Sequence, residues 1–309
     1  MNVHQNFRAY VHDLQDHICS ALEAQDGAAK FREDQWQRPG GGGGRTRVIA
    51  DGAVFEKGGV NNSEVFGRLP ADALEGRIAA DSRFFACGLS LVLHPSNPYV
   101  PTVHMNVRMF EVHDDSDAVT DRWFGGGVDL TPYYFYEADV RHFHATLRDA
   151  CAKTDRSLYA RFKHVCDEYF ENRHRGGEAR GVCGIFFDDL RTEAGCDDAE
   201  WMRFVQDCGD AFLPAYQPIV EARRGTNYGV REIDWQEIRR GRYVEFNLVH
   251  DRGTLFGLRT AGRIESILMS LPPRAQWRYD YAPEAGSAEA ALLAALAPRD
   301  WLAEEASHV

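Results

Sequence analysis

Apolar side chains recur at helical spacing at the start of the chain, and a β-like pattern follows. The helical positions are Val3, Phe7, Tyr10, Val11, Leu14, Ile18 and Leu22. This spacing of three or four residues predicts an amphipathic helix. Arg45–Ala50 and Ala53–Lys57 then flank Asp51-Gly52, a pair that is typical of a hairpin turn. Further strands are predicted at Phe84–His94, Val103–Val112 and Gly126–Leu130.

The second half of the chain returns to helical periodicity with strands between the helices. The predicted elements are helices at 137–152 and 156–173, a strand at Gly181–Phe187, a helix from Trp201 to Phe212 that stops near Pro214, and a short helix at 232–240. Apolar residues alternate in Arg242–Val249, which predicts a strand with Thr254–Arg259 as its hairpin partner. Strands and helices come in clusters rather than in strict alternation. The pattern therefore favours one α+β domain over residues 1–309, a large, mainly antiparallel sheet flanked by helices on both faces.

The charge balance argues against a nucleic-acid partner. The 309 residues include 35 basic and 47 acidic side chains, which leave a formal net charge of −12. No block of Lys and Arg supplies the positive surface that phosphate binding needs. A site for an anionic small molecule must therefore be built from local arginines that override the overall field.

Nothing in the sequence predicts a membrane anchor or secretion. The longest apolar run, Ala290–Ala297, is too short to span a bilayer. The first six residues have neither the basic nor the apolar region of a signal peptide. The seven cysteines are an odd number without a C-x-x-C pair, so neither a disulfide framework nor a thiolate zinc site is expected. We expect a soluble, cytoplasmic protein without a transmembrane segment.

The most informative stretch for chemistry is the predicted strand around residue 106. Alternation places His104, Asn106 and Arg108 on one face and the apolar residues between them on the other. A base, an amide and a guanidinium in one row suit an acidic, hydrogen-bonding ligand, although a solvated strand face would look similar. On the preceding strand, Ser90 and His94 also share a face and could reach the same space. A histidine that caps a loop is the alternative for His94.

Three glycines and an aspartate follow in Gly125–Gly127 and Asp129. Glycine inside a strand gives up packing and costs conformational entropy, so another backbone or a flat ligand is expected to approach closely there. Asp129 could accept hydrogen bonds from the N–H groups of a cyclic ligand or act as a base. The alternative is an aspartate that caps the turn before Thr131-Pro132.

Two further groups of residues have an open interpretation. His94, His104, His144 and His174 could bind a divalent ion, but no two of them have a recognised ligand spacing. His144 lies in the apolar stripe of its helix. Arg259–Arg263 places arginines around a glycine, which could form an anion cradle or an ordinary turn with solvated arginines. No dinucleotide or phosphate-loop motif is present.

In this order, these stretches resemble the oxygen-dependent coproporphyrinogen III oxidases of haem biosynthesis. The matching runs are Gly41–Val48, Phe55–Asn61, His94–Thr102, Trp123–Pro132, Gly184–Leu190, Gly241–Leu248, Asp251–Leu258 and Glu265–Pro273. They cover nearly the whole chain. The one departure is Ala261 in Ala261-Gly262-Arg263, where the family usually has Gly-Gly-Arg.

The resemblance implies a homodimer that decarboxylates two propionates of coproporphyrinogen III oxidatively to vinyl groups, with O₂ as co-substrate and no organic cofactor. It implies that His104, Arg108 and Asp129 are catalytic. Substrate contacts would come from Ser90, Asn106, Val107, Arg108, Ala261, Gly262 and Arg263. His94, His104, His144 and His174 match positions proposed as metal ligands in bacterial members, with Mn²⁺ as the candidate ion.

The resemblance also implies dimer contacts between about Tyr243 and Trp277, and the apolar row of the strand predicted there would need a cover. Two other functions remain open. One is a metal-dependent hydrolase that uses the four histidines, and the other is a tetrapyrrole-binding protein without catalytic activity.

Overall fold

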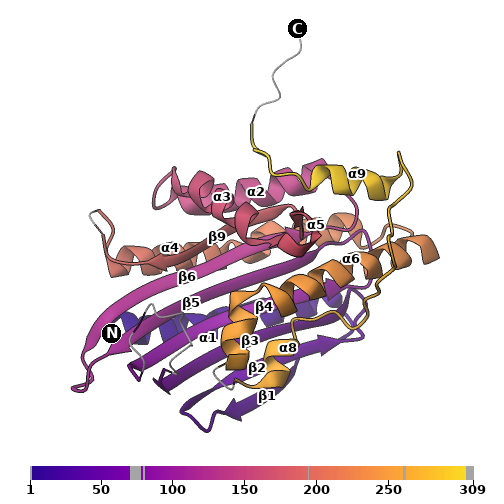
Figure 1. Cartoon of the computed structure of the whole chain (residues 1–309). Helices are drawn as coiled ribbons and strands as arrows, with labels where there is room; N and C mark the ends of the chain where they lie inside the picture. Colours follow the sequence, from indigo (N-terminus) through magenta and orange to yellow (C-terminus); the bar gives the residue numbers. More distant parts are fainter. Residues whose placement is uncertain (1, 70–77, 79–80, 194, 260–261, 304–309) are drawn as a thin grey trace.

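One large β-sheet organises the computed structural model, which describes residues 2–69, 78, 81–193, 195–259 and 262–303 (Figure 1). Seven strands pair antiparallel in the order β1-β2-β3-β4-β5-β6-β9. Their bounds are β1 Arg32–Gln37, β2 Gly42–Ala50, β3 Phe55–Arg68, β4 Arg83–Pro95, β5 Thr102–His113, β6 Val119–Thr131 and β9 Cys183–Leu190. Up to β6 each strand pairs with the next one along the chain. The predicted α+β fold with an antiparallel sheet is confirmed.

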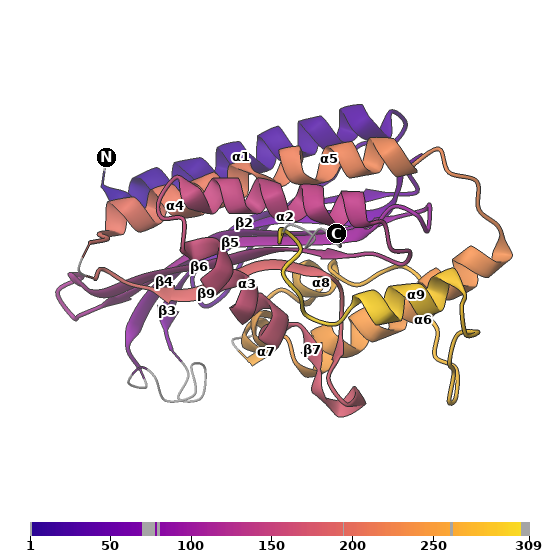
Figure 2. The same cartoon turned by 90° about the horizontal axis from the view of Figure 1, so that it is seen from above.

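Helices cover both faces of the sheet (Figure 2). α1 and α4 pack against the central strands on one face, with α2 and α5 beside them, while α3 runs along β9 at the sheet edge. α6, α7 and α8 lie over the opposite face (Figure 1). The helices are α1 Val3–Asp26, α2 Glu137–Ala152, α3 Leu158–Tyr169, α4 Asp198–Asp210, α5 Phe212–Arg223, α6 Val230–Val249, α7 Arg252–Arg259, α8 Ile264–Leu268 and α9 Ala288–Ala295.

Small elements connect the larger ones. A two-stranded ribbon joins β7 Glu171–Asn172 to β8 Glu178–Ala179, and the 3₁₀ turn η1, Arg173–Arg175, lies between them. Of the helices that the structure describes, none has both the length and the hydropathy needed to cross a membrane.

The first helix forms as its sequence predicts. Asn2 caps it by accepting a hydrogen bond from the backbone N–H of Gln5, and the Gln5 side chain completes the capping box. Gly27 ends the helix with a φ of 77°, a left-handed conformation that glycine adopts without strain. The apolar stripe of α1 is buried, so this helix closes one face of the sheet over the core.

The prediction of a strand at 242–249 with a hairpin partner at 254–259 is wrong, because these residues belong to the helices α6 and α7. The side chains that α6 buries recur at helical spacing, but many of them are polar. Gln236, Arg239, Arg240 and Asn247 are all buried. An apolar pattern therefore could not reveal the helix, and the short alternation of Val244, Phe246 and Leu248 imitated a strand.

Other boundaries also differ from the prediction. α3 ends at Tyr169, so His174 lies in the turn η1 and not at the end of a helix. α4 ends at Asp210, and Pro214 lies in the first turn of α5, a position where proline is tolerated. β1 was not predicted, and β3 continues far beyond Lys57 to Arg68. Of the glycines after Pro39, Gly40 and Gly41 lie in the turn before β2, and Gly42–Gly44 form the start of the strand.

Candidate active site

Polar side chains from three neighbouring strands meet on the sheet face that α6–α8 cover. His104, Asn106 and Arg108 project from β5 to this face, as the alternation predicts. In register with them, Ser90 on β4 lies beside Asn106, and Asp129 on β6 lies beside His104. Cross-strand partners in an antiparallel sheet share a face and have side chains in contact range. The structure thus brings these five predicted site residues together.

Asp129 is the most buried member of this group and is held by two cationic or basic neighbours. Nδ1 of His104 lies 2.6 Å from one carboxylate oxygen, and the Arg180 guanidinium donates to the other. Arg180 is itself buried, between β8 and β9, and its guanidinium lies over three aromatic rings. These rings are those of Phe170, Tyr243 and Phe246, with the guanidinium carbon 4.0, 4.6 and 4.9 Å from their centroids.

These contacts decide the charge of Asp129. Burial alone would raise the pKa of this carboxyl group, but the neighbouring Arg180 and His104 outweigh burial and hold the pKa below its usual value. Asp129 is therefore ionised at neutral pH. Because an ionised carboxylate only accepts hydrogen bonds, Nδ1 of His104 carries the hydrogen. The side-chain partners are His104 and Arg180 rather than backbone N–H groups of the turn at Thr131, which argues against a role as a turn cap.

Arg108 lies four residues beyond His104 on β5 and remains about one-third exposed. Nη1 donates to the Asn106 side-chain oxygen at 2.7 Å, and Nη2 lies 2.9 Å from a carboxylate oxygen of Asp188 on β9. Burial would lower the pKa of Arg108, but the charge of Asp188 raises it. The pKa of Asp188 is lowered in return, against the effect of its own burial. Both groups are charged, and Arg108 faces the space above the sheet.

The glycines of β6 make room for this arrangement. A Cβ atom on Gly125 would lie 2.7 Å from an oxygen of Asp188 and 2.8 Å from Nε of Arg108. A Cβ atom on Gly126 would lie 2.5 Å from the backbone oxygen of Asn106. The predicted close approach is observed, by a side-chain ion pair at the first glycine and by a neighbouring backbone at the second.

The other predicted substrate contacts lie elsewhere. Val107 is fully buried on the opposite face, so its side chain points to the α1 and α4 layer. Arg263 forms an ion pair with Asp34 on β1, four strands from β5 in the sheet and hence roughly 19 Å away. The backbone N–H of Gly262 bonds to the carbonyl of Gly257 at 2.8 Å. Ala261 lies outside the described residues.

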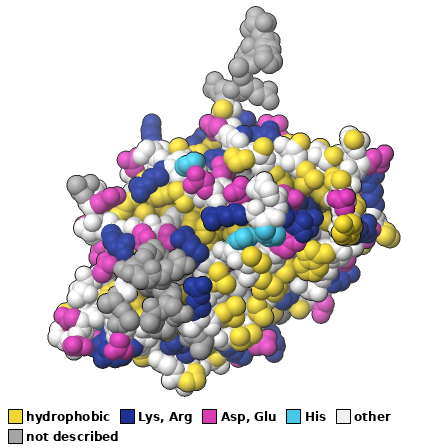
Figure 3. Space-filling view, in the orientation of Figure 1, with side chains coloured by type: hydrophobic (Ala, Val, Ile, Leu, Met, Phe, Trp, Pro, Cys, Tyr) yellow, Lys and Arg dark blue, Asp and Glu magenta, His cyan; other side chains and the backbone are white. Residues whose placement is uncertain are grey.

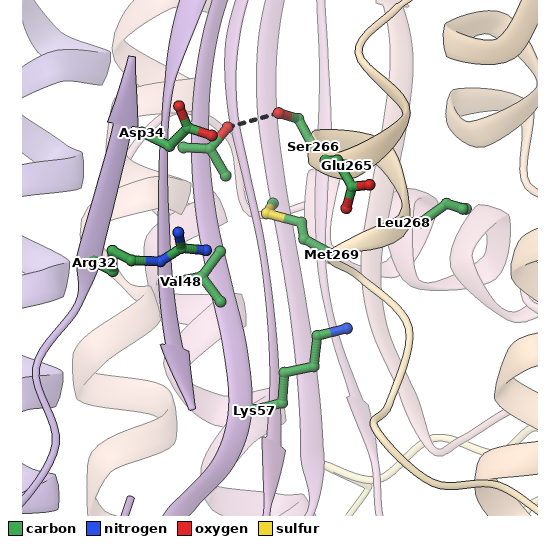
Figure 4. Close-up of a pocket in the computed structure, with 9 residues that line it drawn as sticks. Arg32, Asp34, Val48, Lys57, Glu265, Ser266, Leu268 and Met269 are labelled. Atoms are coloured by element: carbon green, nitrogen blue, oxygen red, sulfur yellow. Dashed lines mark hydrogen bonds between the residues drawn. The ribbon is translucent and has the colours of Figure 1, made fainter. Parts of the chain in front are cut away.

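A cavity of about 180 Å³ lies at this far end of the same sheet face, between β1, β2, β3 and α8 (Figure 4). Arg32 and Lys57 line it, and the hydroxyls of Thr46 and Ser266 meet at 2.8 Å across its wall. Because Asp34, Thr46, Asn61, Ser90 and Asn106 are successive partners in register, one polar row leads from this cavity to Asp129 and Arg108.

Two of the four histidines considered as metal ligands are buried and fully hydrogen-bonded. His94 contacts the Thr102 hydroxyl at 3.1 Å and a backbone carbonyl at 2.9 Å. His144 contacts the Tyr159 hydroxyl at 2.9 Å and a backbone carbonyl at 3.1 Å. Burial lowers the pKa of His144 to about 3, and burial with the charge of nearby Arg240 lowers that of His94. Both are neutral, and each uses both ring nitrogens in contacts with the protein.

The other two histidines do not complete a metal site. His174 lies at the surface, with Nδ1 at 2.8 Å from His250 and Nε2 at 3.1 Å from Glu245. His104 is bound to Asp129. Over the described ranges, no group of three or more His, Cys, Asp and Glu side chains is placed to hold a metal ion. The four histidines therefore do not fit a shared metal.

The site on this α+β fold thus consists of the buried Asp129 with its partner His104 and of the partly exposed, charged Arg108. Residues 6–301 match the sequence model of the family described as coproporphyrinogen III oxidase. The chain is also 50% identical over 312 residues to a Glycine max protein named oxygen-dependent coproporphyrinogen-III oxidase, chloroplastic, and the alignment covers 97% of this chain and 80% of the relative.

The chain therefore belongs to the coproporphyrinogen III oxidase family, which confirms the resemblance seen in the sequence. The prediction of an oxidoreductase of porphyrin and haem biosynthesis is confirmed with it. Neither the hydrolase nor the binding protein without catalytic activity gains support from these comparisons.

Sequence reasoning did not find two residues that shape the site. Arg180 comes from the short connection between β8 and β9, 51 positions away from Asp129 in sequence, and no local pattern marks it. Asp188 lies in the matching run Gly184–Leu190, where it alternates with Phe186 and Gly184 on β9. That alternation could have placed Asp188 on the same face as Arg108, two strands away.

Proposed function

We propose that this chain oxidatively decarboxylates two propionates of coproporphyrinogen III to vinyl groups, giving protoporphyrinogen IX, on the polar sheet face around Asp129 and Arg108. The family and the name of the Glycine max relative support this substrate and the use of O₂. The observation that carries the assignment of the site is an ionised, buried Asp129 bound to His104, which lies four residues along β5 from Arg108.

Arg108 is proposed to hold one propionate. Its guanidinium is charged, partly exposed and fixed on one side by Asn106. A guanidinium binds a carboxylate by two parallel hydrogen bonds, which fixes orientation as well as position. Ser90 and Asn106 add polar groups beside it on the same face.

Asp129 and His104 are proposed to act together as the base. Asp129 accepts hydrogen bonds from pyrrole N–H groups of the substrate and draws off a proton, and His104 is the more exposed member of the pair. The resulting electron-rich pyrrole is open to oxidation by O₂. Each propionate then loses CO₂ from its end and a hydrogen with its electron pair from the carbon next to the ring. The two electrons pass to O₂, and a vinyl group remains.

We propose that this chemistry needs no organic cofactor and no metal at the four histidines. Those histidines are spread over β4, β5, α2 and η1, and the buried pair uses its ring nitrogens for protein contacts. O₂ is the proposed electron acceptor.

Two further properties concern the assembly and the location of the protein. A homodimer is expected from the family, and apolar side chains are exposed on α6 and α7, where Figure 3 shows hydrophobic groups gathered on the face that α6 crosses. A cytoplasmic location stays a prediction from the sequence, since the name of the Glycine max relative places that protein in the chloroplast.

The test of the function is turnover of coproporphyrinogen III by purified, chelator-treated protein in air and under anaerobic conditions. We expect CO₂ release, O₂ consumption and protoporphyrinogen formation in air, and none of them without O₂. Loss of all activity on chelation with recovery on addition of Mn²⁺ would promote the histidines to metal ligands. Binding without CO₂ release would favour the binding protein.

A further inference from the structure

Arg108 is already neutralised by a carboxylate of the protein. Asp188 on β9 accepts from Nη2 of Arg108 at 2.9 Å, and its second oxygen lies 3.6 Å from Nη2 of Arg252, the first residue of α7. Both guanidinium groups lie near the ring of Phe186, with the carbon of each within 6 Å of the centroid. Asp188 therefore lies between two arginines, at a place where the carboxylate of a ligand could also bind.

The ion pair restricts what else Arg108 can bind. Nη2 is paired with Asp188, so a ligand carboxylate at this nitrogen must displace Asp188 or bind beside a second negative charge. The Asp188 group and a propionate end are the same functional group. Both favour the same charged nitrogen, and two carboxylates side by side there would repel each other.

We propose that Asp188 is a positioning residue that holds Arg108 in the ligand-free protein and is displaced by a substrate propionate. This inference rests on the proposed function, because it takes Arg108 as a propionate contact. Asp188 then sets the affinity for the substrate, since binding must first break the internal ion pair. The displaced Asp188 retains Arg252 as its partner, which keeps its charge compensated and links binding to the start of α7.

The charge of the site predicts in which direction the affinity for the substrate should change when Asp188 is replaced. The whole chain carries −12, so anionic substrates are repelled at long range. Removal of the Asp188 charge leaves Nη2 of Arg108 without a competing carboxylate and makes the site more positive. Substrate binding should therefore become tighter. If Asp188 instead serves only to orient Arg108, its removal should make binding weaker.

The experiment compares Asp188→Asn with Asp189→Asn, the adjacent acid on the same strand, which pairs with Arg191 on the other side. Asn keeps the shape in both variants and tolerates the positive φ of 55° at position 189. We expect a KM for coproporphyrinogen III about two- to fivefold lower for Asp188→Asn, the scale for a partly exposed ion pair, with kcat within about twofold. The gain should shrink as salt rises. Asp189→Asn should leave both constants unchanged.

A double variant separates the proposed competition from a general charge effect. In an Arg108→Gln background, Asp188→Asn should no longer lower KM, because the contested donor is absent. A higher KM for Asp188→Asn, or an equal decrease for Asp189→Asn, would overturn the proposal. Asp188→Ser gives the same comparison if the Asn variant melts early. An inactive wild type would instead refute the proposed function itself, and titration with oxidised coproporphyrin III as a probe of binding would tell the two failures apart.

Discussion

At the scale of single residues, the pair of Asp129 and His104 carries the proposed chemistry. We predict that Asp129→Asn lowers turnover by roughly 10²-fold or more, the scale for loss of a general base. Asn cannot take the proton, and it removes the charge that fixes the His104 tautomer. Binding of oxidised coproporphyrin III should change much less. O₂ consumption and a fluorescence titration of the porphyrin measure the two effects.

The same variant should also lose stability, because Arg180 is buried and would keep only a neutral partner. Breaking a buried ion pair costs about 3 kcal/mol, so the melting temperature must be measured and the assay run well below it.

Arg108→Lys is the informative contrast to Asp129→Asn, since it keeps the charge, loses the forked hydrogen bonds and should raise KM as well as lower turnover. A near-wild-type rate for Asp129→Asn would end the catalytic assignment.

At the scale of elements, two adjacent glycines of strand β6 should differ in what a substitution changes. A side chain at Gly125 should mainly affect substrate binding, and one at Gly126 should mainly affect stability. Gly125→Ala places a methyl group against the flexible ends of Arg108 and Asp188, which can move aside. We predict a cost in unfolding free energy of about 1 kcal/mol or less and a clear rise in KM, since the propionate contact shifts. Gly126→Ala meets the backbone oxygen of Asn106, which cannot move alone, and should cost more stability, about 2 kcal/mol. Denaturant unfolding and steady-state kinetics measure both. Equal effects of the two variants on KM would refute this division.

Some elements of the fold can be predicted from local sequence patterns, and others cannot. β5 was predicted because one of its faces is buried against α1 and α4, which leaves an apolar alternation over residues 103–109 of the sequence. α6 buries arginines and amides, and Arg240 is fully buried in contact with Glu56 and Tyr133. Tertiary hydrogen bonds create that burial, and a sequence does not display them. The helix was therefore missed.

The same limit applies to the site. Alternation within one strand was enough to place His104, Asn106 and Arg108 on one face, because their spacing is fixed by the backbone. The partners Arg180 and Asp188 reach the site through pairing between distant strands and a short ribbon. Their positions depend on the register of β6 with β9, which no local pattern specifies.

At the scale of the whole molecule, Glu245 ties α6 to η1 and to the segment after α8. It accepts hydrogen bonds from Arg175 and from Nε1 of Trp277, and it contacts His174. Burial opposes the shift, but these hydrogen bonds outweigh it and lower the pKa of Glu245 to about 2. A carboxyl group whose pKa is lower in the folded protein than in the unfolded chain contributes stability. This contribution is fully present when the pH is above the unfolded pKa, and it is lost as the pH falls through the folded pKa.

We therefore predict that Glu245→Gln is about 1 kcal/mol less stable than wild type at pH 7, after allowance for the partial exposure of its partners. The difference should close as the pH falls from about 4.5 toward 2. Denaturant unfolding at fixed protein concentration measures it across this range. A difference that is the same at pH 7 and pH 3 would show that the titration of Glu245 does not cause it.

The proposed homodimer is a property of the whole molecule. The sequence predicted its interface on a strand and a hairpin, but these residues form the helices α6 and α7. The apolar row at 242–249 was expected to need a cover as a strand, but in the helix α6 Phe246 is buried while Leu248 and Val249 remain exposed. Leu258, Ile264 and Trp277 are exposed as well. The expected interface from about Tyr243 to Trp277 thus becomes a surface of helix ends and a loop. Large apolar groups in such a surface are typical of contacts between subunits.

The two ends of α6 supply matched variants for this prediction. Val249 at the last position lies within the expected interface, and Val230 at the first position is exposed outside it. We predict that wild type is a dimer at micromolar concentration and that Val249→Lys raises the dissociation constant by about tenfold or more, because a charge would be buried at the contact. Val230→Lys should leave the dimer intact. Light scattering with sedimentation measures all three proteins. A monomeric wild type, or equal dissociation of both variants, would contradict the assignment of this surface.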